Sequence, residues 1–505
     1  MSVLPSTHPS THSARQATYP AASPCGGSSA APAVRTRALH AVPESVAESV
    51  SESVSKSASE SVSESVARAV TGAQTLPTVV GAGLRVPTLR GETAYANLDH
   101  AASTPALETV KAAVDRALET YSSVHRGAGF ASRLTSAWYE QARTEVADFV
   151  GAREGDSVVF TRTTTDSWAL LSKALPSRTT VFVFGSEHHS TLLPWGRFRT
   201  VRLPVPQTLD DAYALLDEAL SAHQSRHRLV VIAAASNVTG EVWPVRRFAR
   251  LAHEHGARIA VDAAQLSAHR RIDLAAWDAD YVAFSGHKTY APYGAGVLAG
   301  RSDWLDAGTP YLFGGGATRA VTEEGTAWAT GPARHEGGSP NVIGAIALAA
   351  ACATLRRHAD VIEAHETRLL ESLRSGLADV PGVEVLSIFG DDSDRVGVVA
   401  FTVDGWDSAL VSQVLSVEHG IGVRDGKFCA HLLVDELLED PWGERPVTAV
   451  RASIGLGSTP EGVDRLITAV AGLVDHGTAA TWSRTEAGWL VEGADPRDVE
   501  VERPW

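Results

Sequence analysis

Short apolar runs alternate with helical patterns along most of this chain, and this alternation constrains the fold more than any other feature. Strand-like runs are predicted at residues 157–160, 180–184, 229–234, 257–261 and 281–284. Segments with helical spacing of apolar residues, such as 209–223 and 245–255, separate several of them. Alternating strands and helices favour a mainly parallel, doubly wound sheet that binds ligands at the carboxyl ends of its strands. The sequence therefore predicts an α/β fold.

Changes in composition divide the chain into five predicted parts. Residues 1–75 are predicted to be a disordered low-complexity region, because Ser-, Ala- and Pro-rich sequence precedes a four-residue repeat of Val and Glu. Residues 76–106 are predicted to pack with the smaller domain. A large domain is predicted over 107–341 and a smaller α+β domain over 342–476, which opens with a long Ala-rich helix. The tail, 477–505, shows no clear pattern.

Composition and charge argue against several classes of function. The net charge of -15 over 505 residues argues against a nucleic-acid surface. No run of 18 apolar residues occurs, so no membrane span is predicted. The three cysteines, Cys25, Cys352 and Cys429, are too few and too scattered for a disulfide framework or a zinc site. We therefore expect a reducing compartment, the cytoplasm, and no bound metal.

Asp262 and Lys288 are placed where pyridoxal phosphate (PLP) would need them. Asp262 ends the apolar run 257–261, and Lys288 lies in the small-residue turn Ser285-Gly286-His287-Lys288. A buried carboxylate can pair with the pyridinium nitrogen, and a lysine amine can form a Schiff base with the aldehyde. Lysine suits this role because burial lowers its pKa readily. An isolated Asp or Lys is more often a turn cap or a surface residue, so the surrounding motifs decide.

Two motifs surround these residues: V-D-A-A-Q-x-x-x-H-R, from Val261, and F-S-G-H-K-x-Y-x-P-x-G-x-G, from Phe284. Together they resemble the class V aminotransferase family, and within it the SUF-type cysteine desulfurases and selenocysteine lyases. The resemblance extends over about residues 95–474, with the motifs in the expected order. It implies a fold-type I PLP-dependent transferase, in which a doubly wound large domain and a smaller α+β domain form a homodimer.

The resemblance also implies which residues hold the cofactor. Contacts to the cofactor phosphate are implied for Thr164, Thr165, Ser285, His287 and, from the neighbouring subunit, Ser339. Contacts to the cofactor ring are implied for His188, Asn237, Asp262, Gln265 and Lys288, and His188 would also relay a proton. Hydroxyl residues before a helix are, taken alone, more commonly a helix cap. No carboxylate or cysteine lies at ligand spacing from His188, so a metal role is not predicted.

The segment from Val423 to Ala430 resembles the desulfurase motif R-x-G-x-H-C-A, with Phe428 in the place of the histidine. The resemblance implies that the Cys429 thiolate attacks the substrate sulfur and carries it away as a persulfide. We expect Arg424 and Lys427 to favour that thiolate, because nearby positive charge lowers a thiol pKa. An unplaced cysteine is more commonly an inert small apolar residue.

Substrate contacts are implied for Asn237, Arg424 and Arg451. Arg451 lies in an R-x-S motif, whose arginine clamps the substrate carboxylate, a geometry that suits guanidinium. A lone arginine on a strand is otherwise usually a solvated edge residue.

The favoured function is a PLP-dependent cysteine desulfurase that converts L-cysteine to L-alanine and passes sulfur to an acceptor protein. In that reaction Lys288 would also remove the Cα proton. A first alternative is another class V reaction, namely aminotransfer, epimerisation or a different C–S lyase, none of which needs Cys429. A second is a non-catalytic scaffold with a PLP-enzyme fold, which the intact set of Lys288, Asp262, His188 and Arg451 disfavours.

Overall fold

A computed structural model describes residues 75–125, 127–439, 447–486, 488–498 and 503–505 of the chain. The chain separates into two units, of which the second runs from Gln74 to Trp505. The predicted low-complexity region, 1–75, lies outside the described residues except for its last position. The description below therefore concerns the second unit.

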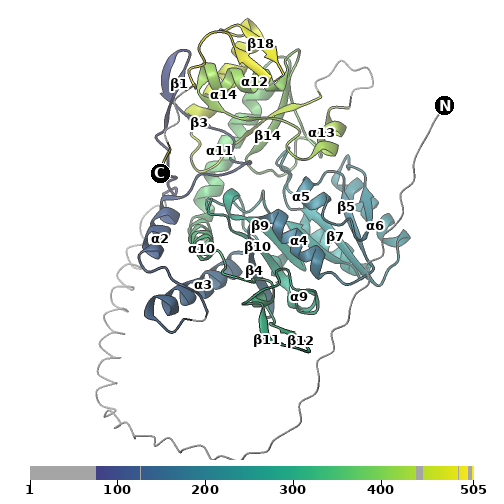
Figure 1. Cartoon of the computed structure of the whole chain (residues 1–505). Coiled ribbons are helices and arrows are strands. Elements are labelled where there is room, and N and C mark those ends of the chain that lie inside the picture. Colours follow the sequence, from purple (N-terminus) through teal and green to yellow (C-terminus); the bar gives the residue numbers. More distant parts are fainter. Residues whose placement is uncertain (1–74, 126, 440–446, 487, 499–502) are drawn as a thin grey trace, which may run out of the picture. The chain divides into compact units, whose positions relative to one another are not determined.

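A seven-stranded sheet, in the order β4-β10-β9-β8-β7-β5-β6, forms the centre of this unit (Figure 1). The strands are β4 (Asp156–Thr161), β5 (Thr179–Phe184), β6 (Arg199–Leu203), β7 (His227–Ala233), β8 (Arg258–Asp262), β9 (Tyr281–Ser285) and β10 (Gly296–Arg301). Only β10 runs antiparallel to its neighbours, β4 and β9. The predicted mainly parallel α/β sheet is confirmed.

Two strands of the sheet, β6 and β10, were not predicted. β6 is an edge strand with mostly exposed residues, two of them arginines, so it lacks the apolar run that marks the others. β10 is buried, but two of its six residues are glycines, which interrupt its apolar pattern. In both strands, pairing with neighbouring strands outweighs weak local preference.

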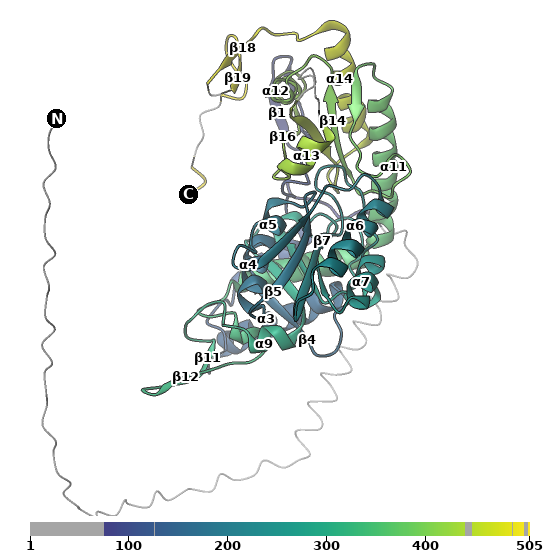
Figure 2. The ribbon, with the colours of Figure 1, turned by 90° about the vertical axis from the view of Figure 1, so that its right-hand side faces the viewer.

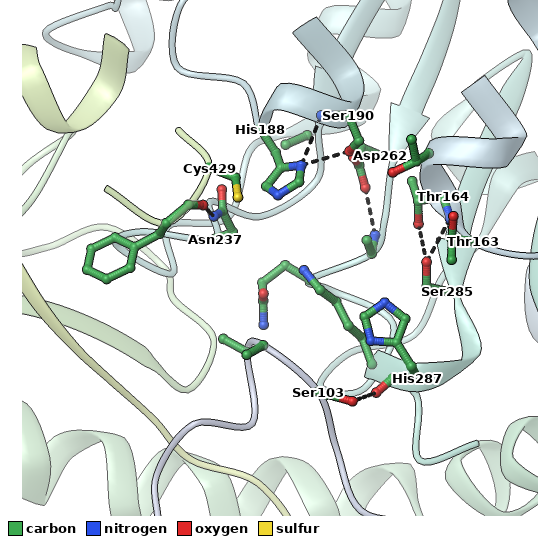
Figure 3. A pocket seen from close by; sticks show the side chains of 18 of the residues that line it. Ser103, Thr163, Thr164, His188, Ser190, Asn237, Asp262, Ser285, His287 and Cys429 are labelled. Atoms are coloured by element: carbon green, nitrogen blue, oxygen red, sulfur yellow. Dashed lines mark hydrogen bonds between the residues drawn. The ribbon is translucent and has the colours of Figure 1, made fainter. Parts of the chain in front are cut away.

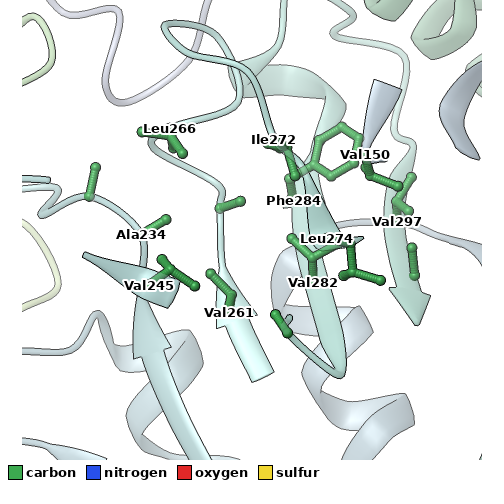
Figure 4. Packing of buried hydrophobic residues seen from close by; sticks show 14 of the residues in the cluster. Val150, Ala234, Val245, Val261, Leu266, Ile272, Leu274, Val282, Phe284 and Val297 are labelled. Carbon is green, nitrogen blue, oxygen red and sulfur yellow. The ribbon is translucent and has the colours of Figure 1, made fainter. Parts of the chain in front are cut away.

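Both faces of the sheet are buried, because successive strand residues enter two different cores. In β7, Val230 and Ile232 belong to one apolar cluster, whereas Leu229 and Val231 belong to the other. Figure 4 shows the first cluster where neighbouring strands β8, β9 and β10 contribute Val261, Val282, Phe284 and Val297. A doubly wound sheet requires this two-sided burial.

Helices cover the two faces separately. Helix α4 (Thr164–Ala174) packs on one face, whereas α6 (Leu209–Ala222) and α7 (Val245–Glu254) pack on the other (Figure 2). Helices α2 (Glu108–Leu118), α3 (Phe130–Phe149) and α10 (Val342–Arg357) also contribute to the second of these faces. Each of these helices overlaps a segment in which the sequence shows helical spacing.

A separate core, apart from the two that flank the large sheet, lies around a four-stranded antiparallel sheet of order β13-β14-β17-β16. Its strands are β13 (Val383–Val385), β14 (Val398–Val403), β16 (Arg424–Gly426) and β17 (Ala449–Ser453), and its helices are α11 (Ala359–Ala378), α12 (Ser408–His419) and α14 (Pro460–His476). We call this part the small domain and the part around the seven-stranded sheet the large domain. From the N-terminal segment, β3 (Ala96–Asn97) pairs with β15 (Ile421–Gly422) beside the small domain.

The predicted long Ala-rich helix is two helices, and this changes the predicted boundary at residue 342. The helix breaks at His358, and α10 and α11 meet at a bend of 77°. α10 packs into the core of the large domain through Leu348, Cys352 and neighbouring residues, so the small domain begins with α11 rather than at 342. Within the described residues no single helix could cross a membrane by length and composition, and α10 with α11 is the one bent pair that meets those criteria together.

The C-terminal tail, in which no pattern was predicted, contains a hairpin. Strand β18 (Trp482–Thr485) pairs antiparallel with β19 (Gly488–Val491). Trp482 and Trp489 pack against the core of the small domain. Most residues of the two strands are partly or fully exposed, so the strands lack the apolar run by which the others were predicted.

Candidate active site

A cavity of about 500 Å³ lies where the carboxyl ends of the large-domain strands face the small domain. All the predicted site residues except Ser339 line it: Thr164, Thr165, His188, Asn237, Asp262, Gln265, Ser285, His287, Lys288, Arg424, Cys429 and Arg451. Figure 3 shows Cys429 and Asn237 toward one end of the cavity and Thr164 and Ser285 toward the other. The roles predicted for these residues stay predictions, but the fold does bring the residues together.

Lys288 ends a short turn, Gly286–Lys288, directly after β9. The turn is tight, because a Cβ atom at Gly286 would lie 2.8 Å from the carbonyl oxygen of Ala295 and 2.9 Å from that of Ala291. Burial and the nearby positive charge of Arg451 lower the pKa of the Lys288 amine to about 8, with Asp262 opposing the shift. A substantial fraction of this amine is therefore neutral, and nucleophilic, just above neutral pH.

Asp262, the last residue of β8, is fixed by two hydrogen bonds. The Thr191 hydroxyl donates to Oδ2 at 2.5 Å, and the Ala264 N–H donates to Oδ1 at 2.9 Å. The carboxylate is almost fully buried. Sequence reasoning missed Thr191, whose only signal is a hydroxyl one helical turn after His188. The arrangement presents a buried, oriented carboxylate to the cavity.

His188 follows β5 and is held as a neutral ring. The N–H of Ser190 donates to His188 Nδ1 at 3.1 Å, so in the neutral ring the proton lies on Nε2. Burial, and then the charge of Lys288, lower the pKa of His188 to about 4. The neighbouring Glu187 is fully buried, which raises the pKa of its carboxyl to about 8. The His188 imidazole and the Glu187 carboxyl, both near Asp262, are therefore mainly uncharged at neutral pH.

The start of α4 provides hydroxyl groups at the other end of the cavity. Thr163 caps the helix, with its side chain accepting from the N–H of Asp166. The N–H of Thr164 donates to Ser285 Oγ at 2.7 Å, and the two hydroxyl groups are also 2.7 Å apart. The exposed Thr165 lines the same end. Hydroxyl groups at a helix N-terminus suit a phosphate, and Thr163 was missed by the sequence prediction.

Gln265 is oriented by a buried chain of hydrogen bonds that reaches the small domain. Its Nε2 lies 3.5 Å from His269 Nε2, and His269 Nδ1 lies 2.5 Å from Glu366 Oε2 on α11. The other oxygen of Glu366 accepts from the N–H of Gly397 at 2.7 Å. No group among the described residues donates to Gln265 Oε1, which is buried. A ligand in the cavity would meet that oxygen or the second N–H of the amide.

Cys429 is exposed in a turn whose backbone is held by the large domain. The Cys429 carbonyl accepts from the N–H of His189 at 2.7 Å, and the Phe428 carbonyl accepts from Asn237 Nδ2 at 2.8 Å. Both residues have left-handed backbone, with φ values of 49° for Phe428 and 54° for Cys429. Such conformations cost about 1–3 kcal/mol each and persist only where surrounding contacts impose them. The two carbonyl bonds are such contacts.

Phe428 fills the position at which the desulfurase motif has a histidine, and its surroundings are apolar. Its side chain packs in a cluster with Val238, Leu433 and other buried residues. The Arg451 guanidinium carbon lies 5.0 Å from the centre of its ring, within cation–π range. Phe428 therefore supports the arginine that is predicted to bind the substrate carboxylate.

The two cations that the sequence places beside Cys429 both form ion pairs. Arg424 forms an ion pair with Asp99, and Lys427 forms one with Asp435. We expected these two cations to favour the thiolate, but each faces a carboxylate that offsets its charge. The sequence did not reveal the pair of Arg424 and Asp99, since Asp99 lies more than 300 positions before Arg424.

Ser339 is not brought to the cavity with the other predicted residues. It is exposed and lines a separate, open hollow with His125, Glu140 and Arg143. This position leaves untested the predicted contact with a phosphate in a neighbouring subunit.

The residues of the cavity fit PLP. A lysine of lowered pKa, an oriented buried carboxylate and a hydroxyl-lined helix start match the aldehyde, the ring nitrogen and the phosphate of that cofactor. In the part of the chain that the structure describes, no three His, Cys, Asp or Glu side chains gather to hold a metal ion.

Known proteins resemble this chain over most of its length. A family model described as aminotransferase class-V matches residues 96–466. A probable cysteine desulfurase of Vibrio cholerae is 32% identical, covering 75% of this chain and 93% of the relative. A cysteine desulfurase of Dickeya dadantii is 35% identical, covering 74% and 90% respectively. The apo structure of a cysteine desulfurase from Thermococcus onnurineus superposes with a TM-score of 0.67 at 30% identity, covering 75% and 94%.

Proposed function

The chain belongs to the class V aminotransferase family, and we propose from this premise that it is a cysteine desulfurase in which Cys429 carries the sulfur. As a member of the family it is a PLP-dependent enzyme. Relatives named cysteine desulfurase, each 32% to 35% identical, support the substrate L-cysteine. One further observation carries the proposal: an exposed cysteine, Cys429, lines the same cavity as Lys288.

The cofactor would be held by Lys288 at its aldehyde, by Asp262 at its ring nitrogen and by Thr164 and Ser285 at its phosphate. When bound, it supplies an electron sink for the bonding pair released at the substrate Cα. Asp262 maintains this capacity, because a buried carboxylate favours a protonated ring nitrogen beside it. The neutral His188 adds no charge next to the ring.

Residues of both domains would bind and cleave the substrate. Arg451 binds the substrate carboxylate, and it remains charged at neutral pH because burial lowers its pKa only to about 10. Lys288 takes the Cα proton. Cys429 Sγ then forms a bond to the substrate sulfur while the Cβ–S bond breaks, and the electron pair of that bond stays with Cβ. Protonation of Cβ and return of a proton to Cα from Lys288 would then give L-alanine, and the sulfur remains as a persulfide on Cys429.

Replacement of Cys429 tests this proposal. In Cys429→Ala we expect release of alanine and sulfide from L-cysteine to fall to background, while the visible absorption of the bound cofactor stays unchanged. Cys352→Ala is the matched control, because Cys352 is buried in α10 and burial raises its pKa well above the usual range. Desulfuration by Cys429→Ala at the parental rate would leave another class V reaction as the function.

We also propose a cytoplasmic homodimer that passes its persulfide sulfur to an acceptor protein. An exposed thiol at Cys429 suits a reducing compartment and leaves the sulfur accessible to an acceptor. The exposure of Ser339 away from the cavity of its own chain suits a contact with a second copy. Sedimentation should give twice the mass of the chain, and Ser339→Ala should weaken cofactor binding in that dimer. A monomer with full cofactor affinity would contradict this part of the proposal.

A further inference from the structure

Asp99 lies between the two arginines that face the cavity, and no motif singled it out. Arg424 donates to it through Nε at 3.2 Å and NH2 at 2.9 Å, and Arg451 NH2 lies 3.4 Å from Asp99 Oδ1. Arg451 also donates to the carbonyl of Asn237 at 2.8 Å and is almost fully buried. Arg424 is half exposed at the mouth. The carboxylate therefore engages both guanidinium groups from one side.

The formal charges of this group match a substrate with one carboxylate. Two guanidinium groups and one carboxylate leave a single positive charge, which the α-carboxylate of an amino acid would neutralise. Asp99 also occupies the side of Arg424 that carries Nε and NH2, the pair of donors with which arginine binds a carboxylate bidentately. While Asp99 remains charged, this Nε and NH2 edge of Arg424 is occupied and cannot bind a second carboxylate.

Arg424 lies where the side chain of a bound amino acid would extend. Both Arg424 and Cys429 line the cavity, and Arg424 is close enough for a Coulomb interaction with the Cys429 thiolate. The substrate sulfur must reach Cys429, so the Cβ substituent lies on this side of the cavity. A negatively charged substituent would meet Arg424 if its donors were free.

We propose that Asp99 determines the charge of the accepted substrate, admitting amino acids with an uncharged side chain and disfavouring those with a second carboxylate. The inference rests on the proposed function only in that Arg451 binds the α-carboxylate. Asp99 acts through Arg424 and is a positioning residue rather than a catalytic one.

Binding of two simple acids to the cofactor-loaded enzyme tests the proposal without turnover. Propionate carries one carboxylate and succinate two, and calorimetry gives the Kd of each. In Asp99→Asn the ratio of the propionate Kd to the succinate Kd should rise about tenfold, the factor that about 1.4 kcal/mol from one charge-assisted hydrogen bond gives. Asp99→Asn/Arg424→Gln should return the ratio to the parental value, because the freed donors are gone.

Asp425→Asn is the matched charge control. Asp425 also lines the cavity next to Arg424, but its side chain accepts from Ser412 Oγ at 2.7 Å rather than from the arginine. We expect this variant to keep the parental ratio. An unchanged ratio in Asp99→Asn, or an equal rise in Asp425→Asn, would overturn the proposal. Failure of the desulfurase function would appear separately, as a parent enzyme that forms no alanine from L-cysteine.

Discussion

At the scale of single residues, burial sets the proton affinities around Lys288. It lowers the pKa of the Lys288 amine to about 8 and that of the His188 imidazole to about 4, and it raises the pKa of the Glu187 carboxyl to about 8. Each shift favours the uncharged form, because a low-dielectric site penalises charge. Asp262 and Arg451 are therefore surrounded by groups that are largely uncharged near neutral pH.

The lowered pKa of Lys288 predicts how the cofactor-free enzyme takes up PLP. Only the neutral amine attacks an aldehyde, and its fraction grows as pH rises through about 8 instead of through the usual lysine range. The rate of cofactor capture, followed by absorbance, should rise with pH and level off above about 9. Arg451→Gln should move the midpoint to higher pH, whereas Lys427→Gln should not move it. A midpoint near 10 in the parent would contradict this.

Phe428→Leu tests the support of Arg451 by the aromatic ring. A cation–π contact at a desolvated site is worth about 1 to 2 kcal/mol, so KM for L-cysteine should rise about fivefold to thirtyfold with little change in kcat. Phe313→Leu provides a control, because Phe313 contacts a cation, Lys173, that does not line the cavity. Equal KM values in the parent and Phe428→Leu would show that the ring does not support substrate binding.

At the scale of elements, α11 is tied to the loop after β8 by the Glu366 carboxylate. That carboxylate accepts from the backbone of Gly397 and bonds to His269, which in turn contacts Gln265. Both Glu366 and His269 are buried. The chain of contacts links the orientation of an amide in the cavity to the position of a small-domain helix.

Glu366→Ala should therefore be strongly destabilising. The substitution leaves the His269 ring and the Gly397 N–H buried without their acceptor, and each buried polar group left unsatisfied typically costs about 1–3 kcal/mol. The free energy of unfolding in urea should fall by about the sum of these two costs. Glu363→Ala, on the same helix, removes an exposed pair with Arg270 and should cost about 0–1 kcal/mol. Similar losses in the two variants would contradict the role assigned to the buried pair.

At the scale of the whole molecule, the candidate site draws on both domains. Lys288, Asp262 and His188 come from the large domain, and Cys429 and Arg451 come from the small domain. All of them belong to the unit from Gln74 to Trp505, which contains both apolar cores. The site is thus assembled by the packing of one domain on the other.

A chain that starts at Gln74 should keep its cofactor and its turnover. The cavity and the apolar cores, as the structure describes them, are formed by residues that follow Gln74. We expect turnover per bound cofactor to stay within about twofold of the full chain. The helix and strand signals in the circular dichroism spectrum should also be retained. Loss of folding or of cofactor would show that the low-complexity region has a structural role.

The sequence determined the α/β fold and most of the site. Apolar runs report burial locally, so β4, β5, β7, β8 and β9 could be predicted, and the motifs placed Asp262 at a strand end and Lys288 in a turn. The edge strand β6 and the hairpin β18–β19 could not be predicted, because most of their residues are partly or fully exposed and form no apolar run. The break between α10 and α11 was hidden by continuous helical composition.

Only the tertiary structure decided which partners the site residues have. Thr191 meets Asp262 across 71 positions, Asn237 meets the Phe428 carbonyl across 191, and Asp99 meets Arg424 across 325. No local pattern encodes such pairs, because they arise when separate strands and domains pack together. The charge around Cys429 is the clearest case. Its two neighbouring cations are visible in the sequence, whereas the carboxylates that offset them are identified only by the fold.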